Sequence, residues 1–316
     1  MSSLLVEISP EPLKKLISDC RVTEILINDF DKVFYEQAGQ LIQAAVPFKS
    51  RNQYEDFLQS LAGAKKTYFN RERPFAEFSF EDFRISIVSN EVSKCGTALS
   101  MRRIALHPFD LSESNRHLTP FIPEELYELV RRKSNLLIVG GTSSGKTTLI
   151  NGLLNIIPQN ERCILIEDTD ELILPNAAST KLLTRPFLNE LLPAIEFDEL
   201  IKRSLRMRPD RLLLGEIRGA EAFNFLMSIS TGHRGSMTSL HADSPQEALL
   251  RLEMLIQLGA PQWSVESIRK LLFLSLDVVI CLEKKDGVRK IKSVSYLSSL
   301  EQSGITFDEI RPPRLV

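Results

Sequence analysis

Residues 140–148 carry the clearest chemistry in the chain. They read Gly-Gly-Thr-Ser-Ser-Gly-Lys-Thr-Thr and match the phosphate-loop pattern GxxxxGK[S/T] in full. Glycines in this pattern let backbone N–H groups converge on phosphate oxygens without Cβ clashes. Lys146 would reach the β- and γ-phosphates, and the Thr147 hydroxyl would bind Mg²⁺. A nucleoside triphosphate and Mg²⁺ are therefore expected against Gly140, Gly141, Thr142, Ser143, Ser144, Gly145, Lys146, Thr147 and Thr148.

Acidic residues follow two other apolar runs. Residues 163–166 are followed by Glu167, with Asp168, Asp170 and Glu171 close behind, and residues 212–215 are followed by Glu216. Hydrolysis of a triphosphate needs a positioned water, a metal near the β- and γ-phosphates and cations on the developing charge. The second run resembles a Walker B strand with a glycine where the aspartate usually stands. Glu216 is therefore predicted to bind the metal or orient the water, and a surface carboxylate is the alternative.

Two of the four histidines, His233 and His241, lie eight residues apart. His233 is bounded by glycines, which indicates a turn, whereas His241 ends a short strand-like run. No carboxylate has a spacing that completes a metal site with them. A sensor role for His241, donating to phosphate or to the bound water, is the prediction, and a purely structural histidine is the alternative.

The elements that must position these residues follow from the apolar pattern. Beyond residue 123, apolar runs at 135–139, 163–167 and 212–214 alternate with helical segments. Such alternation predicts an α/β domain, in which a mostly parallel sheet is covered by helices on both faces. The first run leads into the glycine loop and residues 147–150 continue it as a helix, which is the setting that the loop requires.

The first third of the chain predicts a smaller, mixed α/β domain. We expect a helix at 10–16, strands at 24–27, 33–36, 41–48 and 97–104, a hairpin over 75–88, and a helix at 53–61 that Ser50 caps and Gly63 ends. Residues rich in proline, serine and asparagine then suggest a linker. The predicted divisions are 1–107, a linker at 108–123, and 124–316.

Composition excludes several classes of protein. The chain has 316 residues, 43% of them hydrophobic and 25% charged, with a formal net charge of −2. These values are ordinary for a folded globular protein and are unlike the basic footprint of a nucleic-acid binder. The four cysteines have no disulfide-framework or zinc-ribbon spacing. No signal peptide is expected, and the apolar run at 271–282 is too short to span a membrane, so any membrane association is expected to be peripheral.

Four segments follow one another along the chain in this order: GGTSSGKTT, IEDTDEL, LRMRPDRLLLGEIRGAEA and TGHRGSMTSLHADSPQEALLRLE. They resemble the Walker A, Asp box, Walker B and His box of the bacterial secretion ATPase superfamily, the type II/IV secretion NTPases. The sequences of these segments are most similar to the VirB-type, TrbB and CpaF branch, which serves type IV secretion, conjugation and Tad pilus assembly. Two segments are more similar to CpaF than to the rest of that branch: KLLTRP and GHRGSMTSLHA. The tetracysteine zinc element of the type II branch is absent.

The resemblance implies a RecA-like P-loop motor domain joined by a flexible linker to a PAS-like α+β N-terminal domain, with ATP and Mg²⁺ as ligands. It implies that Glu167 or Glu171 activates water, that Thr147 and Glu216 hold the metal, and that His241 is the His-box residue. It also implies arginines of the N-terminal domain that reach the γ-phosphate. The matching region holds Arg84, Arg102 and Arg103.

Two further sets of cations could act at such a site. Arg218, two residues after Glu216, could pair with a carboxylate across the same site. The predicted helix at 200–208 carries Lys202, Arg203, Arg206 and Arg208. These four form either a solvated face or a cluster that supplies an arginine to a neighbouring subunit's site.

The implied function is a cytoplasmic ATPase motor, assembled as a homo-hexamer at the inner membrane. It would couple ATP hydrolysis to Tad-type pilus assembly or type IV secretion, with inner-membrane platform proteins as partners and no direct nucleic-acid contact. The alternatives are a TrbB-like conjugation ATPase, a nucleotide-gated assembly scaffold with negligible hydrolysis, and a DNA-translocating or helicase-like ATPase.

Overall fold

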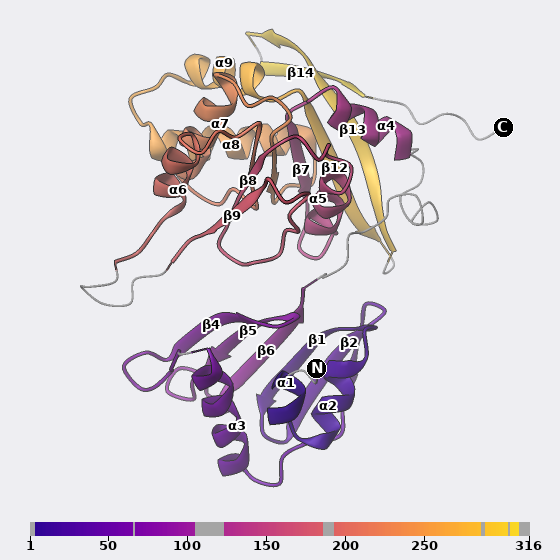
Figure 1. Cartoon of the computed structure of the whole chain (residues 1–316), viewed down its shortest axis with the longest axis vertical. Helices are drawn as coiled ribbons and strands as arrows, with labels where there is room; N and C mark the ends of the chain where they lie inside the picture. The colour runs from indigo at the N-terminus through magenta and orange to yellow at the C-terminus, as the bar shows by residue number, and fades with distance from the viewer. Residues whose placement is uncertain are drawn as a thin grey trace, which may run out of the picture. The chain divides into compact units, whose positions relative to one another are not determined.

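The computed structural model describes residues 4–65, 67–104, 123–185, 193–285, 288–302 and 304–309. The chain divides into two compact units, Met1–Leu106 and His107–Val316 (Figure 1). The linker predicted at 108–123 lies outside the described residues, apart from Pro123, which opens helix α4 (Pro123–Arg131).

The first unit is an antiparallel sheet with helices on one face. Its strand order is β3-β2-β1-β6-β5-β4. The strands are β1 (Val22–Asp29), β2 (Lys32–Gln37), β3 (Gln40–Gln43), β4 (Phe75–Phe80), β5 (Phe83–Val88) and β6 (Ala98–Arg103). Helices α1 (Leu4–Ile8), α2 (Glu11–Ser18) and α3 (Arg51–Ala64) cover one face and enclose a single core with it (Figure 1).

Local sequence rules account for most of this unit, with two corrections. The Ser50 hydroxyl accepts the Gln53 N–H at 3.3 Å and caps α3, as expected. Gly63, however, does not end that helix, which continues to Ala64. Burial of one face of α3 outweighs the roughly 1 kcal/mol helix penalty of a glycine. The strand expected at 41–48 is also shorter and ends at Gln43.

The second unit is built on a mixed sheet of order β14-β13-β12-β7-β11-β10-β8-β9. All pairs from β12 to β9 are parallel, and β13 and β14 extend the sheet antiparallel. The strands are β7 (Leu136–Gly140), β8 (Cys163–Glu167), β9 (Thr180–Leu183), β10 (Arg211–Leu214), β11 (Met237–Leu240), β12 (Val278–Lys285), β13 (Val288–Glu301) and β14 (Gly304–Glu309).

Helices cover both faces of this sheet (Figure 1). One core contains α6 (Phe197–Ser204), α7 (Glu221–Ser230), α8 (Pro245–Gly259) and α9 (Val265–Ser275). The other contains α4 and α5 (Lys146–Leu154). Alternate residues of β7 enter opposite cores, as the period of a strand requires. The predicted fold class is confirmed. Within the described residues, the helices are too short or too polar to cross a bilayer.

A buried arginine links the strand ends opposite to the glycine loop. Arg211 is fully buried, and its guanidinium binds Glu161 Oε2 at 2.6 Å and the Val130 carbonyl at 2.9 Å. Gly235 makes room for it, with φ of 86° and an ideal Cβ position only 2.4 Å from Arg211 Nη1. Arg211 is therefore a structural residue within the RMRPDR segment.

We predict that Gly235→Ala lowers the free energy of unfolding of the second unit by about 3 kcal/mol. The new methyl group strains a left-handed backbone and displaces a buried ion pair. Urea unfolding followed by the fluorescence of Trp263, the single tryptophan, measures this unit. Gly63→Ala in α3 should leave that transition unchanged. A wild-type midpoint for Gly235→Ala would contradict the role of Arg211.

Candidate functional site

Four strand ends of the second unit meet at one edge of the sheet. β7 and β11 pair in parallel with Val139 opposite Leu240, so Gly140 and His241 follow at the same level. β8 and β10 pair with Ile166 opposite Leu214, which places Glu167 beside Gly215. Ligands of parallel α/β sheets bind outside these carboxyl ends.

The glycine loop has the conformation that an anion site needs. Ser143 has φ of 58° and Gly145 has φ of 99°, so the loop turns tightly before α5 begins at Lys146. No side chain caps the first turn of α5. Its N–H groups and the positive end of its dipole are thus available to an anion. The Ser144 hydroxyl is buried without a hydrogen-bond partner in the described residues. Both observations suit a bound phosphate.

The Lys146 ammonium lies at the centre of the site. It is 8% exposed and donates to the Gly140 carbonyl at 2.9 Å and the Gly141 carbonyl at 3.3 Å. It also lies 3.2 Å from His241 Nδ1. A triphosphate would offer this ammonium charged acceptors, which form stronger hydrogen bonds than the carbonyls do.

A chain of polar contacts leads from Lys146 to the Walker B segment. His241 Nε2 lies 3.1 Å from Glu216 Oε1. Arg218 binds the other oxygen of Glu216 at 3.2 Å and Asp168 at 2.5 Å. Burial, together with the positive charge of Lys146, lowers the pKa of His241 despite the opposing effect of Glu216. A neutral ring that accepts from Lys146 and donates to Glu216 fits these contacts.

Glu167 is buried at the end of β8. Its Oε1 accepts the N–H groups of Leu172 at 2.8 Å and Glu171 at 3.2 Å, while Oε2 has no hydrogen bond within the described residues. Burial raises the pKa of Glu167 to about 7, against the lowering effect of Lys181 and of the two N–H groups. The glycine at position 215 leaves room for the Glu167 side chain, because a Cβ there would lie 3.2 Å from Glu167 Cγ.

The second acid candidate, Glu171, lies beside the start of α5. Its Oε2 accepts from the Thr147 hydroxyl at 3.3 Å. No group of three or more potential metal ligands occurs within the described ranges. Mg²⁺ typically uses one or two protein oxygens and completes its shell with water and phosphate. Thr147 and Glu216 supply oxygen donors of the kind that Mg²⁺ prefers, and their assignment as ligands stays a prediction.

The arginines of the first unit differ in what they contact. Neighbouring residues of a strand point to opposite faces, so Arg102 and Arg103 cannot serve one ligand equally. The Arg103 guanidinium binds the Val22, Ile17 and Asp19 carbonyls on the helix-covered side. Those bonds give it a structural role.

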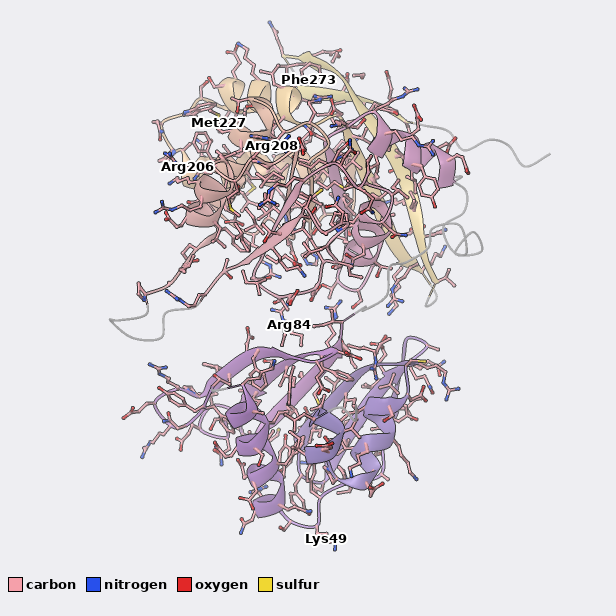
Figure 2. The ribbon with its side chains drawn as sticks, viewed as in Figure 1. Lys49, Arg84, Arg206, Arg208, Met227 and Phe273 are labelled. Atoms are coloured by element: carbon pink, nitrogen blue, oxygen red, sulfur yellow. The ribbon has the colours of Figure 1, made fainter. Side chains whose placement is uncertain are left out.

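Arg84 and Arg102 are cross-strand partners on the opposite face of the same sheet. Arg102 lies 3.8 Å from Glu24, and Figure 2 shows the Arg84 side chain on the face that the helices leave open. Of the three arginines expected near the γ-phosphate, these two remain predicted nucleotide ligands.

Two other predicted features lie away from this edge. His233 Nδ1 contacts the Pro209 carbonyl at 3.0 Å, which is a structural contact. The helix expected at 200–208 ends at Ser204, so Arg206 and Arg208 lie beyond α6, where Figure 2 shows them. Arg203 pairs with Glu199 at 2.7 Å and Arg208 with Asp210 at 3.5 Å.

Sequence reasoning missed three cations around the site. Arg289 of β13 donates to the Ser143 carbonyl of the glycine loop at 2.9 Å. Lys292, three residues later, donates to the Asp243 carbonyl after β11 at 3.0 Å. Lys181 of β9 reaches Glu167. The basic run around Arg289 is visible in the sequence, but only the strand order brings it beside the loop.

Comparison with known proteins agrees with this geometry. A family model described as "Type II/IV secretion system protein" matches residues 7–285. VirB11 of Agrobacterium fabrum is 28% identical over an alignment 332 positions long. The alignment covers 95% of this chain and 96% of that protein. The VirB11 type IV secretion protein of Brucella suis is 32% identical, and the match covers 90% of this chain and 88% of that protein. The conjugal transfer protein TrbB of Rhizobium radiobacter is 28% identical and covers 89% and 85%.

Solved structures are similar in the same way. The Brucella suis VirB11 ATPase in complex with sulphate has a TM-score of 0.50 and 28% identity, covering 93% of this chain and 95% of that one. The pilus retraction motor PilT with bound ADP has a TM-score of 0.63 at 18% identity, covering 100% and 84%. At that identity, PilT supports the fold alone.

Proposed function

Because the chain belongs to the type II/IV secretion system protein family, we propose that it is a Mg²⁺-dependent ATPase that drives type IV secretion or pilus assembly. The observation that carries the proposal is the chain of contacts from Lys146 through His241 to Glu216, built from three neighbouring strand ends. It joins a phosphate-binding cation to an acid that can act on water or metal.

ATP binding would redirect Lys146 from the Gly140 and Gly141 carbonyls and His241 to the phosphate oxygens. The N–H groups at the start of α5 would hold the same oxygens. His241 would then be released from Lys146 and could report the nucleotide state to Glu216 and to α8, which follows it. The contacts of His241 with both Lys146 and Glu216 support the sensor role proposed for it.

Mg²⁺, held by Thr147 and Glu216, would neutralise charge on the β- and γ-phosphates. The attacking water needs a nearby carboxylate to accept its proton. Glu167 suits this task because it is buried and because its Oε2 has no hydrogen bond within the described residues. Glu171 instead accepts from Thr147, and we therefore assign the base to Glu167.

The biological setting is proposed from the relatives. The names VirB11 and TrbB connect those proteins with type IV secretion and conjugal transfer. We propose for this chain the same class of task, in a homo-hexamer peripherally bound at the cytoplasmic side of the inner membrane, with membrane platform proteins as partners. A Tad pilus role, suggested by the CpaF-like segments, stays a prediction.

Steady-state phosphate release tests the activity. The purified full chain should release phosphate from ATP with Mg²⁺, and EDTA should stop the release. Saturable ATP binding without Mg²⁺-dependent release would indicate a nucleotide-gated scaffold and overturn the ATPase assignment. Turnover that depends on added DNA would indicate a DNA-translocating ATPase instead.

A further inference from the structure

Lys181 lies on the edge strand of the second unit, beside the strand that ends in Glu167. β9 pairs with β8 in parallel, with Lys181 opposite Leu165. Glu167 is two residues beyond Leu165 and therefore points to the same face of the sheet. This register brings a lysine from the edge strand to a carboxyl at the ligand-binding end of β8.

The Lys181 ammonium connects three oxygens around that strand end. It lies 3.6 Å from Glu167 Oε2. It also donates to the Asp170 carboxylate and to the Leu172 carbonyl. The segment it holds is the one whose N–H groups bind Glu167 Oε1. Backbone N–H groups thus bind one carboxyl oxygen of Glu167, and the Lys181 ammonium lies beside the other oxygen.

This placement decides how readily Glu167 ionises. The carboxyl is 2% exposed, and burial without a cation strongly favours the neutral form. Of the charged groups that face it, Lys181 favours ionisation and Asp170 opposes it. Glu171 approaches through its N–H, and the adjacent end of β10 presents Gly215, which carries no side chain. Lys181 is therefore the positive charge that offsets burial.

We propose that Lys181 is a positioning residue for hydrolysis, which favours the ionised form of Glu167 and fixes the segment that holds it. The inference rests on the proposed ATPase function and on Glu167 as the acceptor of the water proton. Lys181 acts through Glu167 and need not touch the nucleotide.

The test is the pH profile of kcat for the full chain at saturating Mg²⁺ and ATP, between about pH 6 and pH 9. Lys181→Met keeps the unbranched side chain, one atom shorter, and removes its charge. Because the rate rises as the base deprotonates, this variant should move the rising limb to higher pH by about one unit. At pH 7 that shift lowers the rate about fivefold. Lys181→Arg keeps a cation and should restore the wild-type limb.

Asp170→Asn should shift the pH profile of kcat in the opposite direction. Removing this negative charge makes ionisation of Glu167 easier, so the rising limb should move to lower pH. Lys270→Met, which removes an exposed lysine paired with Glu266 at 2.6 Å, should leave the profile in place. A purely structural role for Lys181 would lower kcat at every pH without moving the limb.

An unmoved limb in both Lys181→Met and Asp170→Asn, with wild-type turnover intact, would overturn this inference and leave the ATPase function standing. Absence of phosphate release from the wild-type chain at any pH would instead overturn the proposed function itself.

Discussion

Lys146→Ala should abolish ATP hydrolysis, lowering kcat by at least about 10²–10³-fold. The buried ammonium is the one cation within hydrogen-bond reach of Gly140, Gly141 and His241 in the described part of the site. Without it, charge that develops on the phosphates loses its buried side-chain cation and is left with backbone dipoles and Mg²⁺. ATP affinity should also fall about 10- to 100-fold, because charge-assisted hydrogen bonds are lost.

Phosphate release and equilibrium binding of a fluorescent ATP analogue measure these two effects. Lys270→Ala, on the exposed surface of α9, is the matched control and should behave as wild type. Circular dichroism shows whether the variant is folded. Turnover by folded Lys146→Ala within tenfold of wild type would remove the glycine loop from the mechanism.

Glu216→Gln should separate binding from turnover. The amide keeps the shape of the side chain and one acceptor oxygen, which can serve either His241 or Arg218 but not both, so ATP should still bind within a few-fold. The variant loses the negative charge needed to hold Mg²⁺ and orient water. We expect kcat to fall by about 10²–10³, the range for loss of one group that stabilises the transition state electrostatically.

Single-turnover kinetics with radiolabelled ATP give the clearest measurement for Glu216→Gln, because they report bound ATP and cleaved ATP separately. Glu216→Ala should stall in the same way. If either variant hydrolyses bound ATP at the wild-type rate, Glu216 has no part in catalysis, and the contacts through His241 are only structural.

Much of the site follows from local sequence. The glycine loop is one continuous motif, and the apolar strand before Gly140 and the helix after Thr147 are read directly from residue types. Glu167 and Glu216 each follow a short apolar run, and His241 follows a strand-like run. Parallel pairing of those runs brings them to one edge, and the pairing itself was predicted from the alternation of strands and helices.

The residues that sequence reasoning missed depend on strand order. Lys181 reaches Glu167 because β9 is the edge strand beside β8, and Arg289 reaches Ser143 from the antiparallel extension of the sheet. Periodicity does not encode which strands are neighbours. Periodicity places Arg103 and Arg102 on opposite faces of the strand, but it does not reveal that Arg103 binds carbonyls of the helix-covered side.

Backbone preferences alone do not predict where two of the helices end. Gly63 was expected to end a helix but lies inside α3. The arginine-rich helix was expected to reach residue 208, yet it stops at Ser204, and Arg208 takes φ of 56°. Arg206 and Arg208 therefore lie after the helix, and the left-handed backbone at Arg208 is one that a helix cannot contain.

The central claim is that a triphosphate binds against the start of α5, with Glu167 and Glu216 opposite it. A crystal structure of the full chain with Mg²⁺ and a non-hydrolysable ATP analogue tests this most directly. It should show the phosphates on the N–H groups of Gly145, Lys146 and Thr147, with the Lys146 ammonium moved from His241 to a phosphate oxygen. An analogue bound elsewhere, or Lys146 still on His241 beside a bound analogue, would contradict the account.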